Sequence, residues 1–173
     1  MVELIKEEDV QKLETEHGIF TANHITGETA EQVYARYLTT KDKQIDICAL
    51  KENKVQESKE QLATWLANNP MLSEIHNPEG EYYTVTQEKQ AQLTQLLMLY
   101  SISVQAGGEM QLTWNSTGGV CEEWTYEQLS TLSFQIAGYV LPRVKKQQQL
   151  EVEINNCNTV EEVGQIEIEY DTI

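Results

Sequence analysis

Residues 109–168 constrain the fold more than any other part of this chain. Apolar side chains alternate with polar ones from Met110 to Trp114, which is the period of a strand with one buried face. A run of turn-forming residues follows, and a second short segment then ends at Trp124. We therefore expect a tryptophan-bearing β-hairpin over residues 110–124.

Two helices are predicted after this hairpin. Thr125 can cap a long helix that starts at Tyr126. The buried face of that helix should consist of Leu129, Leu132, Ile136 and Tyr139 or Val140. Pro142 lies within the pattern and predicts a kink or a break near residues 138–141. Thr159 precedes Glu162 by three residues, the spacing of a capping box, so a short second helix should begin there and bury Val160, Val163 and Ile166.

The clearest helix before the hairpin begins after Thr86, which can act as its N-cap. Its single predicted apolar face consists of Leu93, Leu96, Leu97, Tyr100 and Val104. Gly107 and Gly108 should end this helix, because glycine adopts the left-handed conformation that many C-caps need. Residues 82–85 are expected to be extended.

Residues 1–44 are predicted to form a separate N-terminal arm. A weak helix is expected over residues 6–16, and Thr26 can cap a better one. The second helix carries an apolar stripe that begins at Ala30, and the other members of the stripe are our candidate partner-binding residues: Val33, Tyr34, Tyr37 and Leu38. This stripe should face either the main domain or a partner chain.

Residues 45–80 are predicted to be a linking helix and turn, and residues 81–173 the main domain. The linking helix is polar, with a thin apolar stripe that includes Trp65, and Pro70 should stop it near Asn68. The expected fold class is mainly α with one small β-hairpin (α+β), the helices packing around the hairpin. A helix this polar buries too little to stand alone, so other helices or other chains should cover it.

The charge balance limits the classes of partner. The chain has 28 Asp and Glu against 12 Lys and Arg, a formal net charge of −16. Such a surface repels phosphate, which disfavours nucleic acid and anionic membranes as partners. No apolar run approaches the ~20 residues of a spanning helix, and the N-terminus lacks the pattern of a signal peptide. Three widely spaced cysteines suggest a reducing compartment and buried small side chains.

No catalytic, cofactor or metal site is predicted. The three histidines have no second ligand at i+3 or i+4, and no cysteine pair has metal or redox spacing. Phosphate-loop and nucleophile-elbow motifs are missing from the sequence. Aromatic residues are enriched at interfaces, so Trp65 and Trp124 join the candidate partner-binding residues. Trp114, which alternates with Leu112, should be core, whereas Trp124 could be either core or interface.

One stretch of the chain resembles a known family. The residues that carry the resemblance are Tyr83-x-Val85, Leu112-x-Trp114-x5-Val120, Trp124-Thr-x-Glu127-x-Leu129-x2-Leu132-x3-Ile136-x2-Tyr139-Val140 and Ile154-x2-Cys157-x-Thr159-x-Glu-Glu-Val163-x2-Ile166. They resemble a domain of unknown function encoded by bacteriophages and prophages, whose members often lie among tail-fibre and tail-assembly genes. The resemblance covers roughly residues 82–168.

The resemblance implies a non-enzymatic virion component or assembly factor, made in the host cytoplasm and then carried in the particle. Its partners would be other phage structural proteins or copies of itself, and the family offers no catalytic residues. The alternative is a small acidic cytoplasmic adaptor or chaperone-like binding protein that does not enter particles. Residues 1–44 have no counterpart in the resemblance, and we expect their deletion to abolish partner binding.

Overall fold

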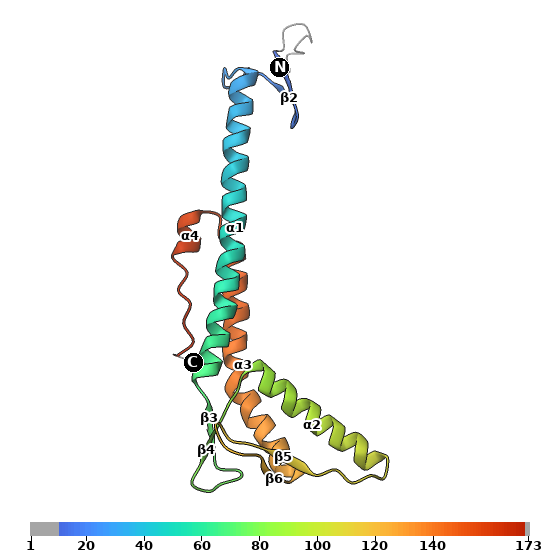
Figure 1. Cartoon of the computed structure of the whole chain (residues 1–173). Helices are drawn as coiled ribbons and strands as arrows, with labels where there is room; N and C mark the ends of the chain where they lie inside the picture. Colours follow the sequence, from blue (N-terminus) through green and yellow to red (C-terminus); the bar gives the residue numbers. More distant parts are fainter. Residues whose placement is uncertain (1–10, 172–173) are drawn as a thin grey trace. The chain divides into compact units, whose positions relative to one another are not determined.

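The structure is a computed structural model that describes residues 11–171, with side chains at all of these positions except 43–45. The chain divides into two compact units, residues 1–51 and residues 52–173. Helix α1 (Ala30–Asn68) contributes residues to both units (Figure 1). Among residues 11–171 helices dominate, and the strands form three small antiparallel two-stranded sheets, so the predicted mainly α class is confirmed.

The first unit contains a hairpin where the sequence predicted a weak helix. Strand β1 (Lys12–Thr15) pairs antiparallel with β2 (Gly18–Thr21), and Leu13 lies opposite Phe20. The helix prediction over 6–16 is therefore wrong for residues 12–15, while residues 6–10 lie outside the described residues. The turn explains the outcome: the Thr15 hydroxyl donates to the Gly18 carbonyl at 3.0 Å, and Gly18 has φ +116°, which favours glycine.

Helix α1 begins after Thr29 and not after Thr26. Thr29 Oγ1 accepts from the Gln32 backbone N–H at 3.3 Å, and Gln32 Oε1 accepts from the Thr29 N–H at 2.8 Å. Thr26 lies instead in a turn closed by a β-bridge between Asn23 and Glu28. From Ala30 to Asn68 the chain has no glycine or proline, so the helix runs through the boundary that we predicted between residues 44 and 45.

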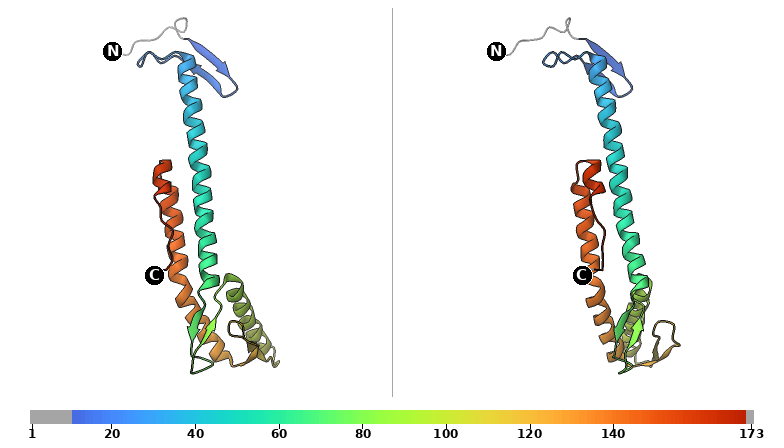
Figure 2. Two further views of the ribbon diagram at one scale, coloured as in Figure 1. Left: turned by 60° about the vertical axis from the view of Figure 1, so that its left-hand side comes forward. Right: turned by 90° about the vertical axis from the view of Figure 1, so that its left-hand side faces the viewer.

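In the second unit, residues 52–68 of α1 lie beside the antiparallel helix α3 (Tyr126–Asn156), as Figures 1 and 2 show. Helix α2 (Gln87–Gln105) packs against the first part of α3. Four short strands complete this part of the unit: β3 (Met71–Ser73), β4 (Glu81–Tyr83), β5 (Leu112–Trp114) and β6 (Glu122–Trp124). The short helix α4 (Val160–Gly164) and a non-helical tail end the described chain.

The predicted hairpin over residues 110–124 is confirmed, because β5 and β6 pair antiparallel with Leu112 opposite Trp124. A further hairpin was missed. Strands β3 and β4 pair with Met71 opposite Tyr83, and each has only three residues, too few to display a period of two. The turn between them is closed by the Gly80 N–H, which donates to the Asn77 carbonyl at 2.9 Å.

Two hydrophobic clusters hold the second unit together. The larger one is made of buried residues from α1, the strands, α2 and the first half of α3, and includes Trp114, Trp124, Leu129, Leu132, Ile136 and Val140. In the smaller one, Leu150 and Ile154 of α3 pack against Tyr170 of the tail. The predicted buried face of α3 is therefore confirmed, and the predicted core position of Trp114 as well.

Helix α3 continues through Pro142 without a break. Figure 2 shows that it bends along its length, in agreement with the predicted kink. Proline has no backbone N–H and its ring displaces the carbonyl four residues earlier, which bends a helix at this point. The Arg143 guanidinium donates to the Tyr139 carbonyl at 2.6 Å, in the turn of helix that precedes the proline.

Hydroxyl caps start the helices of this unit as the sequence predicted. Thr86 caps α2, and Thr125 forms a capping box with Gln128 at the start of α3. Gly107, at φ +74°, ends α2: the N–H groups of Gly107 and Gly108 donate to carbonyls of the last turn at 3.0 and 2.9 Å. Two details differ at α4. Val160 is 48% exposed and not buried as predicted, and the Glu162 carboxylate accepts from the Asn158 N–H at 2.6 Å, so it does not complete the predicted capping box with Thr159.

Thr159→Ala should destabilise the protein by about 1 kcal/mol, the usual contribution of an N-cap hydroxyl. The Thr159 side chain accepts from the Glu162 backbone N–H at 3.1 Å, and alanine leaves that donor without its acceptor. Urea denaturation measures the difference in the free energy of unfolding. Thr159→Ser keeps the hydroxyl and is the control; equal losses from both substitutions would contradict a capping role.

Candidate docking surface

The apolar stripe of the N-terminal arm contacts its own hairpin. The rings of Tyr34 and Tyr37 lie 4.9 and 5.0 Å, between centroids, from the ring of Phe20 on β2. The Tyr34 hydroxyl is also within 3.2 Å of Nδ1 of His17 in the β1–β2 turn. We expected these tyrosines to contact either the main domain or a partner chain. In the structure they contact the β1–β2 hairpin of their own unit instead. Val33 and Leu38 are half-buried.

Trp65 is held by contacts within the second unit. The Arg143 guanidinium lies 4.0 Å from the centroid of the Trp65 ring, and the Tyr139 ring lies 5.7 Å from it. The indole Nε1–H donates to the Asp171 carboxylate at 2.5 Å. Trp65 therefore connects α1 to both α3 and the tail, so its contacts in this structure are within the fold and stabilise it.

Trp124 lies in the core. Its side chain is only 6% exposed and stacks on the His76 ring with a centroid distance of 4.3 Å. The Tyr83 ring meets it edge-on at 5.7 Å. His76 Nε2 lies 2.9 Å from the Glu122 carboxylate on β6, which fixes the imidazole over the indole. A ring covered on these sides offers no surface to a partner, so the core alternative of the sequence analysis is the correct one.

The described residues bring together few groups that carry chemistry. Residues 11–171 contain no group of three or more His, Cys, Asp or Glu side chains that could hold a metal ion. Cys48 and Cys121 are exposed and Cys157 is half-buried, so the expectation of buried cysteines is wrong for the first two. Cys48 lies on an exposed side of α1 and Cys121 in the loop before β6, where no core is near enough to cover a thiol. Within the described helices, none is long and apolar enough to cross a membrane.

The raised pKa values of two buried tyrosines make the stability of the protein depend on pH in the alkaline range. Burial raises the pKa of Tyr83 well above its ordinary value of 10.0, and the nearby Glu81 carboxylate, which accepts from the hydroxyl at 3.1 Å, raises it further. Burial also raises the pKa of Tyr170. The unfolded chain therefore releases these protons first, so their stabilisation is complete below about pH 10 and is lost as the pH rises above it.

Denaturation measured from about pH 8 to about pH 12 should show this loss of stability. Tyr83→Phe should flatten the decline above about pH 10, since one of the two titrating hydroxyls is removed. Tyr82→Phe is the matched control, because Tyr82 is the adjacent residue and is 56% exposed. Identical alkaline profiles for the two variants would contradict the role of Tyr83.

Helix α2 carries several exposed apolar side chains on the surface of the second unit. The inner face of this helix packs on the core through Leu93, Leu96, Leu97 and Tyr100. The opposite side carries Ala91, Gln95, Met98, Leu99 and Ile102, with the spacing i, i+4, i+7, i+8 and i+11, and we call these five residues the outer face of α2. Met98, Leu99 and Ile102 are 63%, 55% and 49% exposed. The helix is thus apolar on both sides, a pattern typical of a helix covered on both sides.

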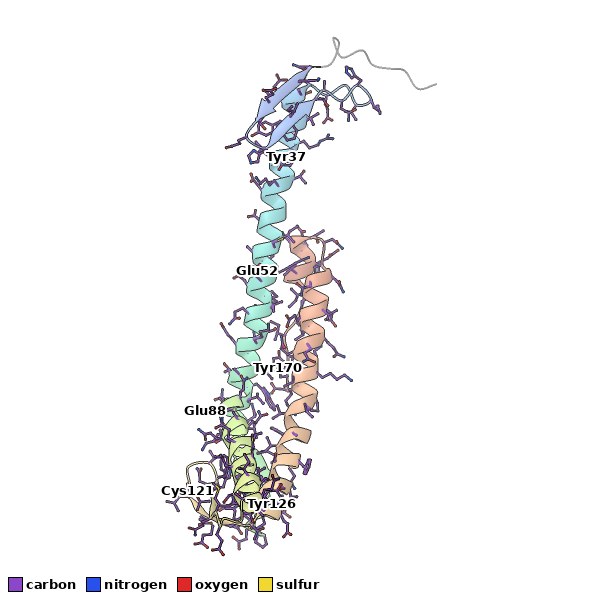
Figure 3. The ribbon with its side chains drawn as sticks, turned by 90° about the vertical axis from the view of Figure 1, so that its right-hand side faces the viewer. Tyr37, Glu52, Glu88, Cys121, Tyr126 and Tyr170 are labelled. Atoms are coloured by element: carbon purple, nitrogen blue, oxygen red, sulfur yellow. The ribbon has the colours of Figure 1, made fainter. Side chains whose placement is uncertain are left out.

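No charged residue occurs from Gln90 to Gly108. The whole chain of 173 residues has 28 acidic and 12 basic residues, 40 charged residues in total, so an uncharged stretch of this length is unusual for it. Glu88, labelled in Figure 3, marks the charged start of the helix. At the other end, the Tyr100 ring stacks on Tyr126 at 5.1 Å. The sequence analysis identified one apolar face on this helix and missed the outer one, although the absence of charge over this stretch could have indicated it.

A groove of ≈ 670 Å³ provides a second apolar surface in the same unit. It is lined by α1, by the first turn of α2 and by α3: Lys59, Leu62, Ala63, Leu66, Thr86, Gln87, Glu88, Gln90, Val140, Val144 and Gln147. Lys59 forms an ion pair of 3.3 Å with Glu151. Hydrogen bonds from Gln147 and Lys59 lower the pKa of Glu151, so this carboxyl stays charged beside the groove.

Comparison with protein-family models, with curated proteins and with solved structures finds no match for this chain. The chemistry of its own surface is therefore the main guide to its function, and the outer face of α2 is the candidate site.

Proposed function

We propose that this chain is a non-enzymatic protein that acts by docking to other protein chains, in several copies, within an assembly of the bacteriophage type. The observation that carries the proposal is the outer face of α2. Its three large apolar side chains are about half exposed or more. Each Å² of apolar surface removed from water contributes roughly 25 cal/mol, so covering these side chains favours association.

The character of the face also selects the partner. Charged residues are depleted in the centres of protein interfaces, whereas methionine and large apolar residues are favoured there. The outer face of α2 combines Met98, Leu99 and Ile102 with a stretch of helix that carries no charged residue. The remaining surface, in a chain of net charge −16, repels other acidic molecules and favours approach by neutral or basic ones.

The type of assembly comes from the resemblance of residues 82–168 to the phage and prophage domain described above. The capped helices and the tryptophan hairpin that carry the resemblance form the scaffold on which α2 lies. An acidic adaptor that never enters particles has the same docking surface, and differs only in where the complex is found.

The proposal is tested on particles released from cells that express the chain together with its phage or prophage genome. We expect the protein to co-sediment with purified particles or tail structures in several copies, as counted by quantitative mass spectrometry. A double variant, Met98→Gln with Ile102→Gln, should lower its incorporation by at least about tenfold, since it makes the centre of the face polar.

Val152→Gln is the control, because Val152 is 60% exposed on α3 and does not belong to the outer face of α2. Incorporation of the double variant at the level of the control would contradict docking through α2. A stable complex in the cytoplasm, with none of the protein in particles, would favour the adaptor.

A further inference from the structure

A small pocket at the start of α3 combines aromatic rings with carboxylates. Its volume is ≈ 370 Å³, and we call it the Tyr126 pocket; the side chains that a ligand meets there come from α2, from the β5–β6 hairpin and from the first turn of α3, and include Tyr100, Gln111, Glu123, Tyr126 and Glu127. We infer that this pocket binds an arginine side chain of a partner protein. The inference rests on the proposed docking function and names the chemistry of one contact in it.

Two tyrosines supply the aromatic surface. Tyr126, labelled in Figure 3, begins α3, and its ring stacks on that of Tyr100 with a centroid distance of 5.1 Å and an interplanar angle of 19°. Tyr100 packs against the core, whereas Tyr126 is 40% exposed, so part of the Tyr126 ring is open to a ligand. The face of an aromatic ring is negative in its charge distribution and attracts cations, most often the guanidinium of arginine.

Glu123 and Glu127 supply the charge. Both are exposed and line the pocket. Glu123 accepts a hydrogen bond from the Gln111 amide, which is neutral and leaves the charge in place. Neither carboxylate forms an ion pair with a basic side chain that the structure describes, and none of the residues that line the pocket is Lys or Arg. The pocket therefore holds two negative charges next to an open aromatic ring.

The fold fixes this arrangement before any ligand binds. Thr125 and Gln128 form the capping box at the start of α3, with hydrogen bonds of 2.9 and 3.1 Å. Leu112 and Trp124, both buried, form the floor of the pocket and pair with each other across the hairpin. A pocket held in place by such contacts loses little conformational entropy on binding, which favours affinity.

The combination of ring and carboxylates selects arginine among possible side chains. An apolar side chain would remove water from the carboxylates without replacing its hydrogen bonds, and an acidic one would be repelled. Guanidinium is planar and has five N–H donors, so it can stack on Tyr126 and donate to Glu123 or Glu127 at the same time. The ammonium of lysine is compact and strongly hydrated and has no flat surface to stack. The net charge of −16 also attracts a basic partner from a distance.

The experiment titrates the full chain with N-acetyl-arginine amide and records ¹H–¹⁵N correlation spectra at constant ionic strength. N-acetyl-citrulline amide is the matched ligand, because it has nearly the same shape without the charge. The arginine compound should bind at least about tenfold more tightly, since hydrogen bonds between charged groups are stronger than neutral ones. The signals that shift should be those of residues 100, 110–112 and 123–127. Equal binding of the two compounds, or shifts confined to other residues, would overturn the inference.

Variants of the chain test the two features separately. Glu123→Gln and Glu127→Gln should each weaken binding of the arginine compound by about three- to tenfold, and the double variant should bind the two compounds equally. Tyr126→Leu should weaken it by about threefold, whereas Tyr126→Phe should keep it, because a phenyl ring still attracts cations. Circular dichroism of each variant should match the wild type, since these side chains lie on the surface.

Glu153→Gln is the matched control, because it removes one charge from an exposed position of the same helix, outside the pocket. It should leave binding unchanged. A loss equal to that of Glu127→Gln would mean that the net charge alone attracts the compound, and would overturn the site. In particles, the Glu123→Gln and Glu127→Gln double variant should be incorporated less than Glu153→Gln. Equal incorporation would overturn the assignment of the pocket to a partner chain.

The inference and the proposed function fail on different observations. A chain that prefers the arginine compound but is absent from particles overturns the phage-type assembly alone. A chain that is incorporated into particles but does not distinguish the arginine compound from the citrulline compound overturns the arginine site alone.

Discussion

Replacing Trp124 by alanine should destabilise the protein by about 3–5 kcal/mol, the range observed when a large aromatic side chain is removed from a core. The indole is 6% exposed and has the His76 ring stacked on it and the Tyr83 ring against its edge. The cavity left by alanine would remove both ring contacts. It would also leave Leu112, the residue opposite Trp124 in the hairpin, without its cross-strand neighbour.

The measurement is the free energy of unfolding from urea titrations followed by circular dichroism. Val120→Ala is the control: Val120 lies in the loop of the same hairpin and is 78% exposed, so its truncation should change stability by less than about 0.5 kcal/mol. A loss below about 1 kcal/mol for Trp124→Ala would mean that the ring is not core. Trp124 would then return to the list of partner-binding candidates.

Sequence patterns predicted the elements in which a period repeats several times. The buried face of α2 extends over about two turns and that of α3 over several, and threonine caps mark where both helices begin. Capping depends on one side chain and on backbone groups within three residues of it, so it can be predicted without tertiary information. The hairpin over residues 110–124 has a tryptophan on each strand and a loop of turn formers between them.

The failures occur where short segments depend on contacts that are distant in sequence. Strands β3 and β4 have three residues each and are defined by their pairing, which no local period displays. Strand β1 was interpreted as helix because Val10 and Leu13 would fall on one side of a helix within a charged segment. That error propagated to Tyr34 and Tyr37, which were expected to face the main domain or a partner chain because the hairpin that contains Phe20 was not predicted.

The candidate docking surface was missed for a different reason. A hydrophobic period identifies the side of a helix that faces the core, and α2 has apolar residues on two sides, so one face was assigned and the other was overlooked. The informative signal was the absence of charge between Gln90 and Gly108. Because charged residues are depleted in the centres of protein interfaces, an uncharged stretch in a strongly acidic chain indicates a segment that is buried in the core or in an interface.

The tail should be a structural part of the second unit, and Tyr170→Ala tests this with an expected loss of about 3–5 kcal/mol. The Tyr170 ring is 3% exposed and packs on Leu150 and Ile154 of α3. Its hydroxyl donates to the Ser58 carbonyl of α1 at 2.8 Å. In Figure 3, Tyr170 is labelled beside α1 and α3, the two helices that its side chain connects.

Two further variants separate the contributions of the ring and the hydroxyl. Tyr170→Phe keeps the ring and should lose only about 1 kcal/mol, the net value of one hydrogen bond. Val152→Ala, at a position 60% exposed on the same helix as Leu150, should have almost no effect. Without the ring, the neighbouring Asp171 would also lose the position from which it accepts from Trp65. Unfolding of Tyr170→Ala at the wild-type urea concentration would mean that the tail is not bound to α1 and α3, and that the cluster around Leu150 and Ile154 is stable without it.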